Sequence, residues 1–555
     1  MVQVRRIVSW STGVICGAVA AATSTADLNP EWTAIVPVGT ALSSGIQGFA
    51  VDGAGNSYVT GTAGSSSNTD VFTAAFDTQG ALLWSHSFNG SADWHDQGRG
   101  ITVSRDGFVY VVGNTPGPGL YSNVLLLKYD AATGALLNTV QYSSGPFTAE
   151  FAQTVTTDTD GNVYLGGGTV GDGPDSLILS FTDSGQFRWK RTWDGPASSP
   201  YSQDQAREVL IDPNGDLLVM MIGYMSSLQA DYIVHKYSSQ DGSTIWEANW
   251  GVRGGDFARD MEVDAAGDVY VTGTGIDVID KYSTIKLAGQ TGALLWQAYD
   301  SNGNDNYANA LALDGSGGVY VTGGADPDGN RSNFNDNFYT VKRSADDGSL
   351  VWTHSYGENC VGCFEVPADV AVDPAGNVLI TGSSDTLPYE GTVLFALDAG
   401  TGALRDAGST FEVGGSFLAF DAAYNIYIGG GTYDPNTGEK AMSAARYASL
   451  VGDLYRLEVE ELIAGRIASL SITNATPNST QYIGYSLRGY GSTPVPQLGV
   501  VLDLDDPQLL TSGRSNASGD FTTSAFVPAA AQGRRVWLQA AEQGRVTPAF
   551  DRVVE

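Results

Sequence analysis

The sequence predicts an all-β protein: an eight-bladed β-propeller that is closed by its N-terminal strand and followed by a small β-sandwich domain. Three observations lead to this prediction. A pattern recurs eight times at intervals of 48 to 59 residues, each copy contains four short strand-like segments, and the pattern stops near residue 452. The 70 glycines and the 10% aromatic share suit many short strands joined by tight turns.

Residues 1–26 predict a secretory signal peptide. Arg5 and Arg6 precede an apolar run over residues 7–22, and small residues follow as far as Ala26. No later run is long and apolar enough to span a bilayer. We therefore expect a mature protein outside the cytoplasm, either secreted or held in the cell envelope, with no integral membrane segment.

The net charge of −33 and the pI near 4.2 narrow the choice of partners. A polyanion such as nucleic acid, or an anionic membrane, would be repelled over the whole surface. Proteins, glycans, cations and basic surfaces remain as candidate partners.

The repeat occupies residues 31–450 and is clearest in AVDGAGNSYVTG from Ala50 and ALALDGSGGVYVTG from Ala310. Each copy predicts an apolar first strand, a tight turn, a second strand such as 58–61, a third such as 124–129 and a fourth such as 81–88. The residues that open the tight turn are Asp52, Ser104, Asp158, Asp212, Asp264, Asp314, Asp373 and Asp421.

Loop lengths give each predicted blade two different ends. The turns between strands one and two, and between three and four, are short, whereas the other connections are long and variable. In an up-and-down sheet the long connections share one face, so we expect function on this long-loop face.

The eighth copy has no fourth strand before the composition changes. Residues 31–37 align with residues 83–88 of the first copy, so they predict the missing strand. Pairing of this segment into the last blade would close the propeller and remove exposed sheet edges.

The Asp-x-x-Gly-Asn-x-Tyr-Val-Thr-Gly copies resemble the bacterial SBBP-type β-propeller repeat. The turns at 130–137, 291–296 and 398–402 resemble the tryptophan-docking motif of eight-bladed quinoprotein (PQQ-like) propellers. We expect the indoles at this position to pack between blades, with ligand stacking as the alternative. The position holds Trp84, Trp189, Trp246, Trp296 and Trp352, with Asn138 and Asp406 replacing it in copies two and seven.

The quinoprotein resemblance implies a PQQ cofactor, a calcium ion and a catalytic aspartate. The site residues of that family cannot be matched to positions in this sequence, and its vicinal cysteine pair is absent. The resemblance therefore supports the fold, and calcium remains the one candidate cofactor.

Candidate ligand-face residues lie eight positions before each turn-opening residue. Five of them are carboxylates, and they are expected near the channel mouth, where they could attract a cation or a basic ligand. The alternative, which we favour, is that each accepts hydrogen bonds from loop amides or pairs with Arg99, Arg207 or Arg259 three positions further on. The five carboxylates are Asp96, Glu150, Asp204, Asp256 and Glu365.

Two loops predict local chemistry. Asp326, Asp328 and Asn330 offer oxygen ligands suited to calcium, although the same residue types are ordinary turn formers. Cys360 and Cys363 are the only cysteines beyond the signal peptide, so we expect a local disulfide outside the cytoplasm.

Residues 452–555 predict a separate domain. Strand patterns at 466–473, 481–487, 498–504, 520–527 and 536–540 suggest a β-sandwich. Residues 482–491 and 528–539 resemble a C-terminal module of bacterial exported multidomain proteins, for which adhesion, sorting and stabilisation remain open roles.

Together these features favour an exported, non-enzymatic binding or scaffold protein that recognises a protein, glycan or cation partner on its long-loop face. The first alternative is a secreted enzyme, either a quinoprotein-like oxidoreductase or a carbohydrate-active lyase or hydrolase. A spacer for the C-terminal domain is the second. No Gly-x-Ser-x-Gly elbow, phosphate loop or His-Glu-x-x-His motif occurs.

Overall fold

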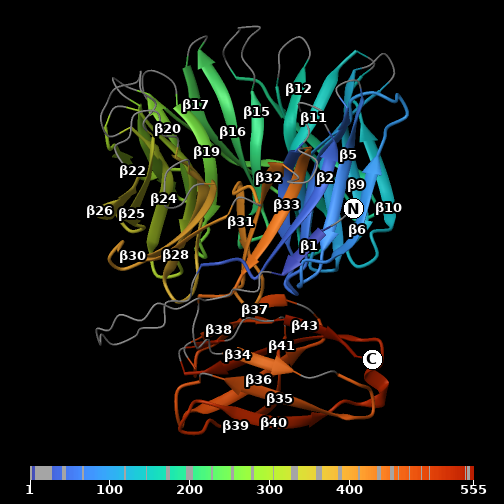
Figure 1. Ribbon diagram of the computed structural model, residues 1–555, viewed down its shortest axis with the longest axis vertical. Helices are drawn as coiled ribbons and strands as arrows, with labels where there is room; N and C mark the ends of the chain where they lie inside the picture. Colours follow the sequence, from blue (N-terminus) through green and yellow to red (C-terminus); the bar gives the residue numbers. More distant parts are fainter. Residues whose placement is uncertain are drawn as a thin grey trace. The chain divides into compact units, whose positions relative to one another are not determined.

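The chain forms an all-β, propeller-like structure in the computed structural model (Figure 1). The structure describes residues 3–6, 28–39, 45–65, 68–117, 121–145, 147–170, 175–195, 204–226, 229–251, 256–276, 280–303, 305–326, 336–357, 365–384, 391–410, 413–433, 439–450, 456–459, 462–473, 475–488, 490–498, 500–504, 506–543, 545–546 and 550–554. The chain divides into two compact units. The first comprises Met1–Phe420 with Asn425–Ala448, and the second Asp421–Tyr424 with Ser449–Glu555.

Six copies of the repeat each form a four-stranded antiparallel sheet in which consecutive strands pair. The second and third copies form β7 (Gln97–Val103), β8 (Phe108–Pro116), β9 (Ser122–Asp130), β10 (Leu136–Tyr142), β11 (Ala149–Thr157), β12 (Val163–Val170), β13 (Ser176–Phe181) and β14 (Phe187–Trp193). The fourth and fifth form β15 (Gln205–Ile211), β16 (Leu217–Ser226), β17 (Gln229–Tyr237), β18 (Thr244–Trp250), β19 (Asp256–Val263), β20 (Val269–Ile276), β21 (Asp280–Leu287) and β22 (Leu294–Asp300). The sixth and seventh form β23 (Asn306–Leu313), β24 (Gly318–Ala325), β25 (Asn337–Ser344), β26 (Leu350–Tyr356), β27 (Glu365–Val372), β28 (Asn377–Ser384), β29 (Gly391–Asp398) and β30 (Leu404–Thr410).

The first and eighth copies share one nine-stranded sheet. Its strands are β1 (Gln3–Arg6), β2 (Trp32–Gly39), β3 (Gly45–Val51), β4 (Ser57–Ser65), β5 (Asn68–Phe76), β6 (Leu82–Phe88), β31 (Phe417–Phe420), β32 (Ile426–Tyr433) and β33 (Lys440–Tyr447). Strand β2 pairs antiparallel with β33, from Trp32 opposite Arg446 to Gly39 opposite Lys440. It thus occupies the place of the fourth strand that the eighth copy lacks.

The repeated aspartate folds the tight turn between the first two strands. Asp52 accepts backbone N–H bonds at Oδ1 from Ala54 (3.0 Å) and Asn56 (2.8 Å), as expected of an Asx-type turn. Its Oδ2 accepts the Asn56 side-chain amide (2.8 Å) and the Tyr58 hydroxyl (3.0 Å). Asp158 makes the same four contacts. The recurring residues of the repeat are therefore the acceptor, which is the aspartate, and the donors of one turn.

Six indoles connect neighbouring copies of the repeat. Each Nε1–H donates to a backbone carbonyl in the turn between the third and fourth strands of the next copy, and each indole is buried. The pairs are Trp32 with Thr78, Trp84 with Ala131, Trp189 with Ser239, Trp246 with Gly289, Trp296 with Ala345 and Trp352 with Ala399, at 2.8 to 3.2 Å. Asn138 keeps the hydrogen bond without the ring, because its Nδ2 donates to the Ser184 carbonyl at 2.8 Å. The predicted packing of the repeat tryptophans between blades is confirmed.

The second unit contains a three-stranded sheet, a five-stranded sheet and a two-stranded hairpin. Its elements are β34 (Arg456–Val459), β35 (Ile467–Thr473), β36 (Thr480–Ser486), β37 (Tyr490–Val495), β38 (Val500–Leu504), β39 (Gln508–Arg514), β40 (Phe521–Phe526), the 3₁₀ turn η2 (Ala529–Ala531), β41 (Arg535–Glu542), β42 (Arg545–Val546) and β43 (Phe550–Val553). The two larger sheets contribute to one apolar cluster that includes Leu470, Ile483 and Leu538.

Candidate functional site

The first strand carries a β-bulge at a corresponding position in the first seven copies of the repeat. The first strands of successive repeats contact one another, and β31 contacts both β27 and β3. A bulge re-aims the extra side chain, so one residue per strand takes a distinct direction. We call these residues the bulge layer: Gln47, Arg99, Gln153, Arg207, Arg259, Asn309 and Ala368.

The amide members of the bulge layer tie adjacent sheets together. Gln153 Nε2 donates to the Ala206 carbonyl at 2.8 Å, and Asn309 Nδ2 donates to the Pro367 carbonyl at 2.7 Å. Both acceptors belong to the residue that precedes the bulge position in the next first strand. At these two positions the bulge residue therefore has a structural role.

The arginine members are placed differently. Arg99 is half-buried, donates to Asn114 Oδ1 (3.1 Å) and Gln97 Oε1 (2.8 Å), and stands over the Phe151 ring at 5.3 Å. Burial lowers the pKa of Arg99, and the positive charge of Arg207 lowers it further. Arg207 and Arg259 are exposed, and Arg259 forms no hydrogen bond or ion pair with any residue that the structure describes.

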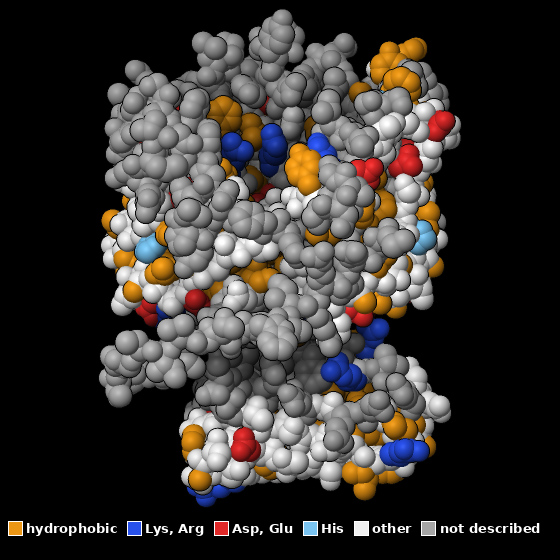
Figure 2. Space-filling view, in the orientation of Figure 1, with side chains coloured by type: hydrophobic (Ala, Val, Ile, Leu, Met, Phe, Trp, Pro, Cys, Tyr) orange, Lys and Arg blue, Asp and Glu red, His pale blue; other side chains and the backbone are white. Residues whose placement is uncertain are grey.

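Positive charge is thus concentrated at this level of the first unit. The repulsion between Arg99 and Arg207 means that their guanidinium groups lie close enough to interact. Figure 2 shows Lys and Arg side chains gathered in a recess of the upper part of the molecule. Such a group can bind an anion through charge-assisted hydrogen bonds.

Carboxylates follow the bulge in three of the first strands. Each accepts a backbone N–H from the next first strand: Glu208 Oε2 from Met261 (2.9 Å), Asp260 Oδ2 from Leu311 (2.6 Å) and Asp369 Oδ2 from Leu418 (2.8 Å). An innermost strand would otherwise leave these edge N–H groups without a partner. The three carboxylates therefore bridge neighbouring sheets.

Burial changes the protonation of this carboxylate group. It raises the pKa of Asp369 to about 6 and that of Glu262, on β19, to about 7. The pKa values of Glu208 and Asp260 lie well above the usual range, first because of burial and then because of repulsion by the neighbouring carboxylates. Protonation reduces the negative charge that these residues set against the arginines.

The five predicted ligand-face carboxylates are all buried. Asp96 accepts the Gly90 N–H at 2.6 Å, Glu150 the Ser144 N–H at 2.9 Å and Asp204 the Gly195 N–H at 2.6 Å. Glu365 accepts the Ser384 hydroxyl at 3.4 Å, and Asp256 is fully buried on β19. The contacts of Asp96, Glu150 and Asp204 fit the loop-amide alternative, and a ligand-binding role for the five residues stays a prediction.

Two other predictions fall largely outside the described residues. Asp326 follows β24, is buried, and donates its N–H to the Asp305 carbonyl at 2.8 Å. Asp328, Asn330, Cys360 and Cys363 lie outside the described ranges, so the calcium site and the disulfide stay predictions. Among described side chains, no three His, Cys, Asp or Glu residues meet in a way that could hold a metal ion.

Among the described residues, no group of side chains offers the calcium site that a quinoprotein cofactor would need. Glu208, Asp260 and Asp369 already accept backbone N–H bonds, and the metal-ligating groups described here do not converge. Within the same residues, no helix is long and apolar enough to cross a membrane.

The repeated sheets and the docked indoles define a propeller of the PQQ-like type. The family model described as outer membrane protein assembly factor BamB matches residues 122–326 and 230–412, and a β-propeller repeat model of the SBBP family matches residues 90–119. The two BamB matches together span slightly more than half of the chain, and the chain belongs to this family.

Several solved structures are similar to the chain, whereas no curated protein matches it. Quinohemoprotein alcohol dehydrogenase from Comamonas testosteroni is 12% identical, with 79% of each chain covered and a TM-score of 0.46. Sqt1 from Chaetomium thermophilum, bound to the N-terminus of ribosomal protein L10, is 12% identical, with 75% of this chain and 100% of that chain covered and a TM-score of 0.46. Polysaccharide lyase Uly1 is 11% identical, with 63% and 89% covered and a TM-score of 0.40.

Sequence reasoning treated Arg99, Arg207 and Arg259 only as partners for the ligand-face carboxylates. It missed Glu208, Asp260, Glu262 and Asp369 altogether. The available signal was positional, because each bulge residue stands three positions after a ligand-face residue.

Proposed function

We propose that this chain is an exported, non-enzymatic binding protein that recognises an acidic group of a protein or glycan partner through the arginines of its bulge layer. The signal peptide would occupy residues 1–26, an eight-bladed propeller residues 31–450 and a β-sandwich domain residues 452–555. Closure by β2 is supported by its pairing with β33 and by the Trp32 indole, which donates to Thr78 in the turn of the first repeat.

One observation carries the binding proposal: exposed, positively charged side chains occupy bulge positions whose amide equivalents have structural contacts. The side-chain amides of Gln153 and Asn309 donate to the neighbouring sheet, whereas Arg259 forms no hydrogen bond or ion pair with a described residue. A guanidinium offers five N–H donors in a planar fork that suits a carboxylate.

The overall charge limits the kind of ligand. With a net charge of −33 the protein repels an extended polyanion, but a local positive group can still accept one or two acidic groups inserted among the first strands. An acidic loop of a protein or a uronic-acid unit of a glycan meets this requirement.

A carbohydrate-active enzyme is the second candidate, and the carboxylates that follow the bulge positions on the first strands favour it. The pKa values of Glu262 and Asp369, about 7 and about 6, suit general acid and base groups near neutral pH. It ranks second because Asp369 accepts backbone N–H bonds at both oxygens, from Val370 and Leu418, which is the arrangement of a structural carboxylate.

The test is a binding screen with matched variants. An array of neutral and uronic-acid oligosaccharides, together with a displayed peptide library, is probed with the wild-type mature chain and with an Arg207→Gln/Arg259→Gln variant. Glutamine is native at the same position in Gln153, so the variant should keep its melting temperature. Arg105→Gln, in an exposed turn at the opposite end of its strand, controls for charge.

The proposal predicts hits that carry carboxylates and that disappear in the double variant but not in the control. Hits restricted to neutral ligands, or hits that survive in the double variant, would exclude the bulge-layer arginines as the binding site. Hydrolysis or elimination of a bound oligosaccharide, abolished by Glu262→Gln, would instead establish the enzyme.

A further inference from the structure

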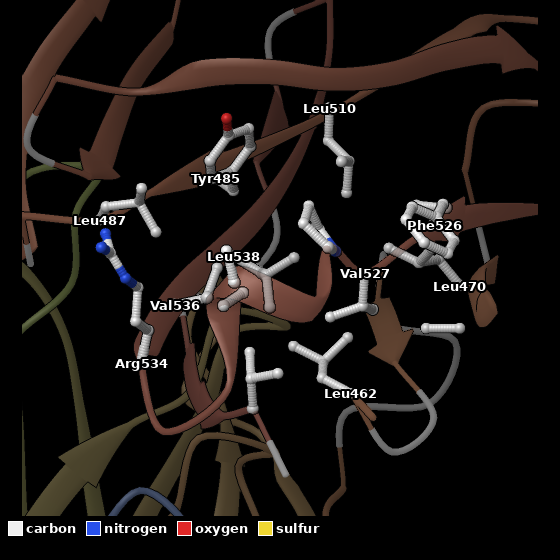
Figure 3. Close-up of a pocket in the computed structure, with 16 residues that line it drawn as sticks. Leu462, Leu470, Tyr485, Leu487, Leu510, Phe526, Val527, Arg534, Val536 and Leu538 are labelled. Carbon is white, nitrogen blue, oxygen red and sulfur yellow. The ribbon is translucent and has the colours of Figure 1, made fainter. Parts of the chain in front are cut away.

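The second unit contains an apolar cavity of about 500 Å³. Leu470 and Ala525 come from the three-stranded sheet, and Leu510 and Leu538 from the five-stranded sheet, so the cavity lies between the two sheets (Figure 3). Its volume falls within the range of small-molecule sites, roughly 300 to 1,000 Å³.

Apolar side chains at the rim remain accessible to water. Leu487 and Phe526 line the cavity and are 52% and 63% exposed, although neighbouring wall residues such as Leu470 and Leu538 are almost fully buried. An accessible apolar hollow of this kind is a favourable environment for a hydrocarbon chain.

Two polar side chains join the apolar lining and have no partner in the described structure. Arg534 follows η2 and its side chain forms no hydrogen bond or ion pair with a described residue, and the Tyr485 hydroxyl, on β36, forms none either. In the view of Figure 3, Arg534, Leu487 and Tyr485 lie toward one end of the cavity, and Leu510, Phe526 and Leu470 lie toward the other. A charged donor at one end and hydrocarbon walls at the other match an amphiphile with one acidic head group.

We propose that this cavity binds a soluble single-chain carboxylate of the fatty-acid type. The hydrocarbon chain lies between the sheets, the carboxylate pairs with the Arg534 guanidinium, and the Tyr485 hydroxyl donates a second hydrogen bond. The charge complementarity at Arg534 distinguishes this occupant from an uncharged apolar ligand.

The test uses calorimetric titration of the full mature chain with dodecanoate, with 1-dodecanol as the uncharged probe. The proposal predicts micromolar binding of dodecanoate and binding of dodecanol that is at least tenfold weaker. Arg534→Gln should weaken dodecanoate binding by about 10- to 100-fold and leave dodecanol unchanged, as expected for loss of a hydrogen bond to a charged group. Arg466→Gln, outside the cavity lining, is the charge-matched control and should bind as the wild type does.

A second variant guards against an indirect effect. Ala530 is an exposed residue of η2 at the cavity, so Ala530→Trp should obstruct entry of both probes without disturbing the core. Equal affinity for dodecanoate and dodecanol, no binding up to millimolar concentration, or unchanged binding in both variants would overturn the proposal. So would binding to dioleoyl phosphatidylglycerol vesicles without dodecanoate binding, or a concentration-dependent dimer that Ala530→Trp abolishes, because these outcomes assign the cavity to a membrane or to a second copy.

Discussion

Because the Trp246 indole packs on Gly292, we expect substitutions at these two residues to be coupled in a double-mutant cycle. Gly292 has a φ of +68°, and a Cβ at this position would lie 2.6 Å from Trp246 Cε3. Gly292→Ala should therefore lower the free energy of unfolding for two reasons. The left-handed backbone costs about 1 to 2 kcal/mol with alanine, and overpacking against the indole costs about 1 to 3 kcal/mol. Trp246→Ala should cost about 3 to 5 kcal/mol through loss of the buried ring and its bond to the Gly289 carbonyl.

The two changes should not add. Once Trp246 is alanine, the added methyl at residue 292 meets no indole, so the second substitution costs only the backbone term. We expect a coupling free energy of about 1 to 3 kcal/mol in the sense that the double variant is less destabilised than the sum of the singles. Gly107→Ala is the matched control, because Gly107 has a φ of +79° and a Cβ there would meet nothing within 4 Å.

The assay is urea denaturation followed by far-ultraviolet circular dichroism, with the midpoint and slope compared across the four chains of the cycle. Gly107→Ala should lower the midpoint by less than Gly292→Ala does. Additive single and double effects, or equal effects of the two glycine substitutions, would refute the docking of the indole as a determinant of sheet-to-sheet packing.

Three further predictions concern buried charge. The folded chain holds the Glu262 proton up to about pH 7, whereas the unfolded chain releases it near 4.5, so stability should fall by up to about 3 kcal/mol as the pH rises from 4.5 to 7. Melting temperatures across this range should show Glu262→Gln gaining stability relative to the wild type; a constant difference would contradict the raised pKa. The pH dependence that His235 contributes has the opposite sign, because burial lowers the pKa of His235 from 6.5 to about 4. Stability should therefore fall by up to about 3 kcal/mol as the pH drops from 6.5 to 4, and His235→Gln should abolish that loss. Lys236→Met should lower the free energy of unfolding, measured in urea, by about 3 to 5 kcal/mol. The reason is that the buried Asp212 carboxylate, 2.6 Å from the Lys236 Nζ, loses its cation. Adding Asp212→Asn should restore most of that loss, and failure to do so would argue against the ion pair.

The repeating parts of the fold could be predicted because each recurring residue of the repeat has a local physical role. Asp52, Asn56 and Tyr58 are close in sequence and meet in one turn, so their spacing is visible without a structure. Residues 31–37 were recognisable as a strand without a sheet because Trp32 stands at the position that Trp84 occupies in its own repeat.

The bulge layer could not be predicted because a bulge is a difference in register between two strands. Arg207 and Glu208 are neighbours in sequence, but the bulge between Ala206 and Glu208 separates their roles: one is exposed and the other bridges to Met261. Their partners come from the next repeat, about fifty residues away, and no spacing within one repeat encodes that contact.

The cavity of the second unit could not be predicted from the sequence for a related reason. Leu470 alternates with Ser469 and Ser471 as in any half-buried strand, and only the packing of two sheets leaves a space beside it. Arg534 adds no motif of its own, since arginines in a short exposed turn are common on protein surfaces.

The most direct test of the proposed function is the affinity of the first carboxylate-bearing ligand from the screen, measured by calorimetry against wild-type, Arg207→Gln/Arg259→Gln and Arg105→Gln chains at two salt concentrations. The account predicts that the double variant binds at least tenfold more weakly, that the control binds normally, and that added salt weakens the wild type more than the double variant. Equal affinity and equal salt dependence in all three chains would contradict recognition by the bulge-layer arginines.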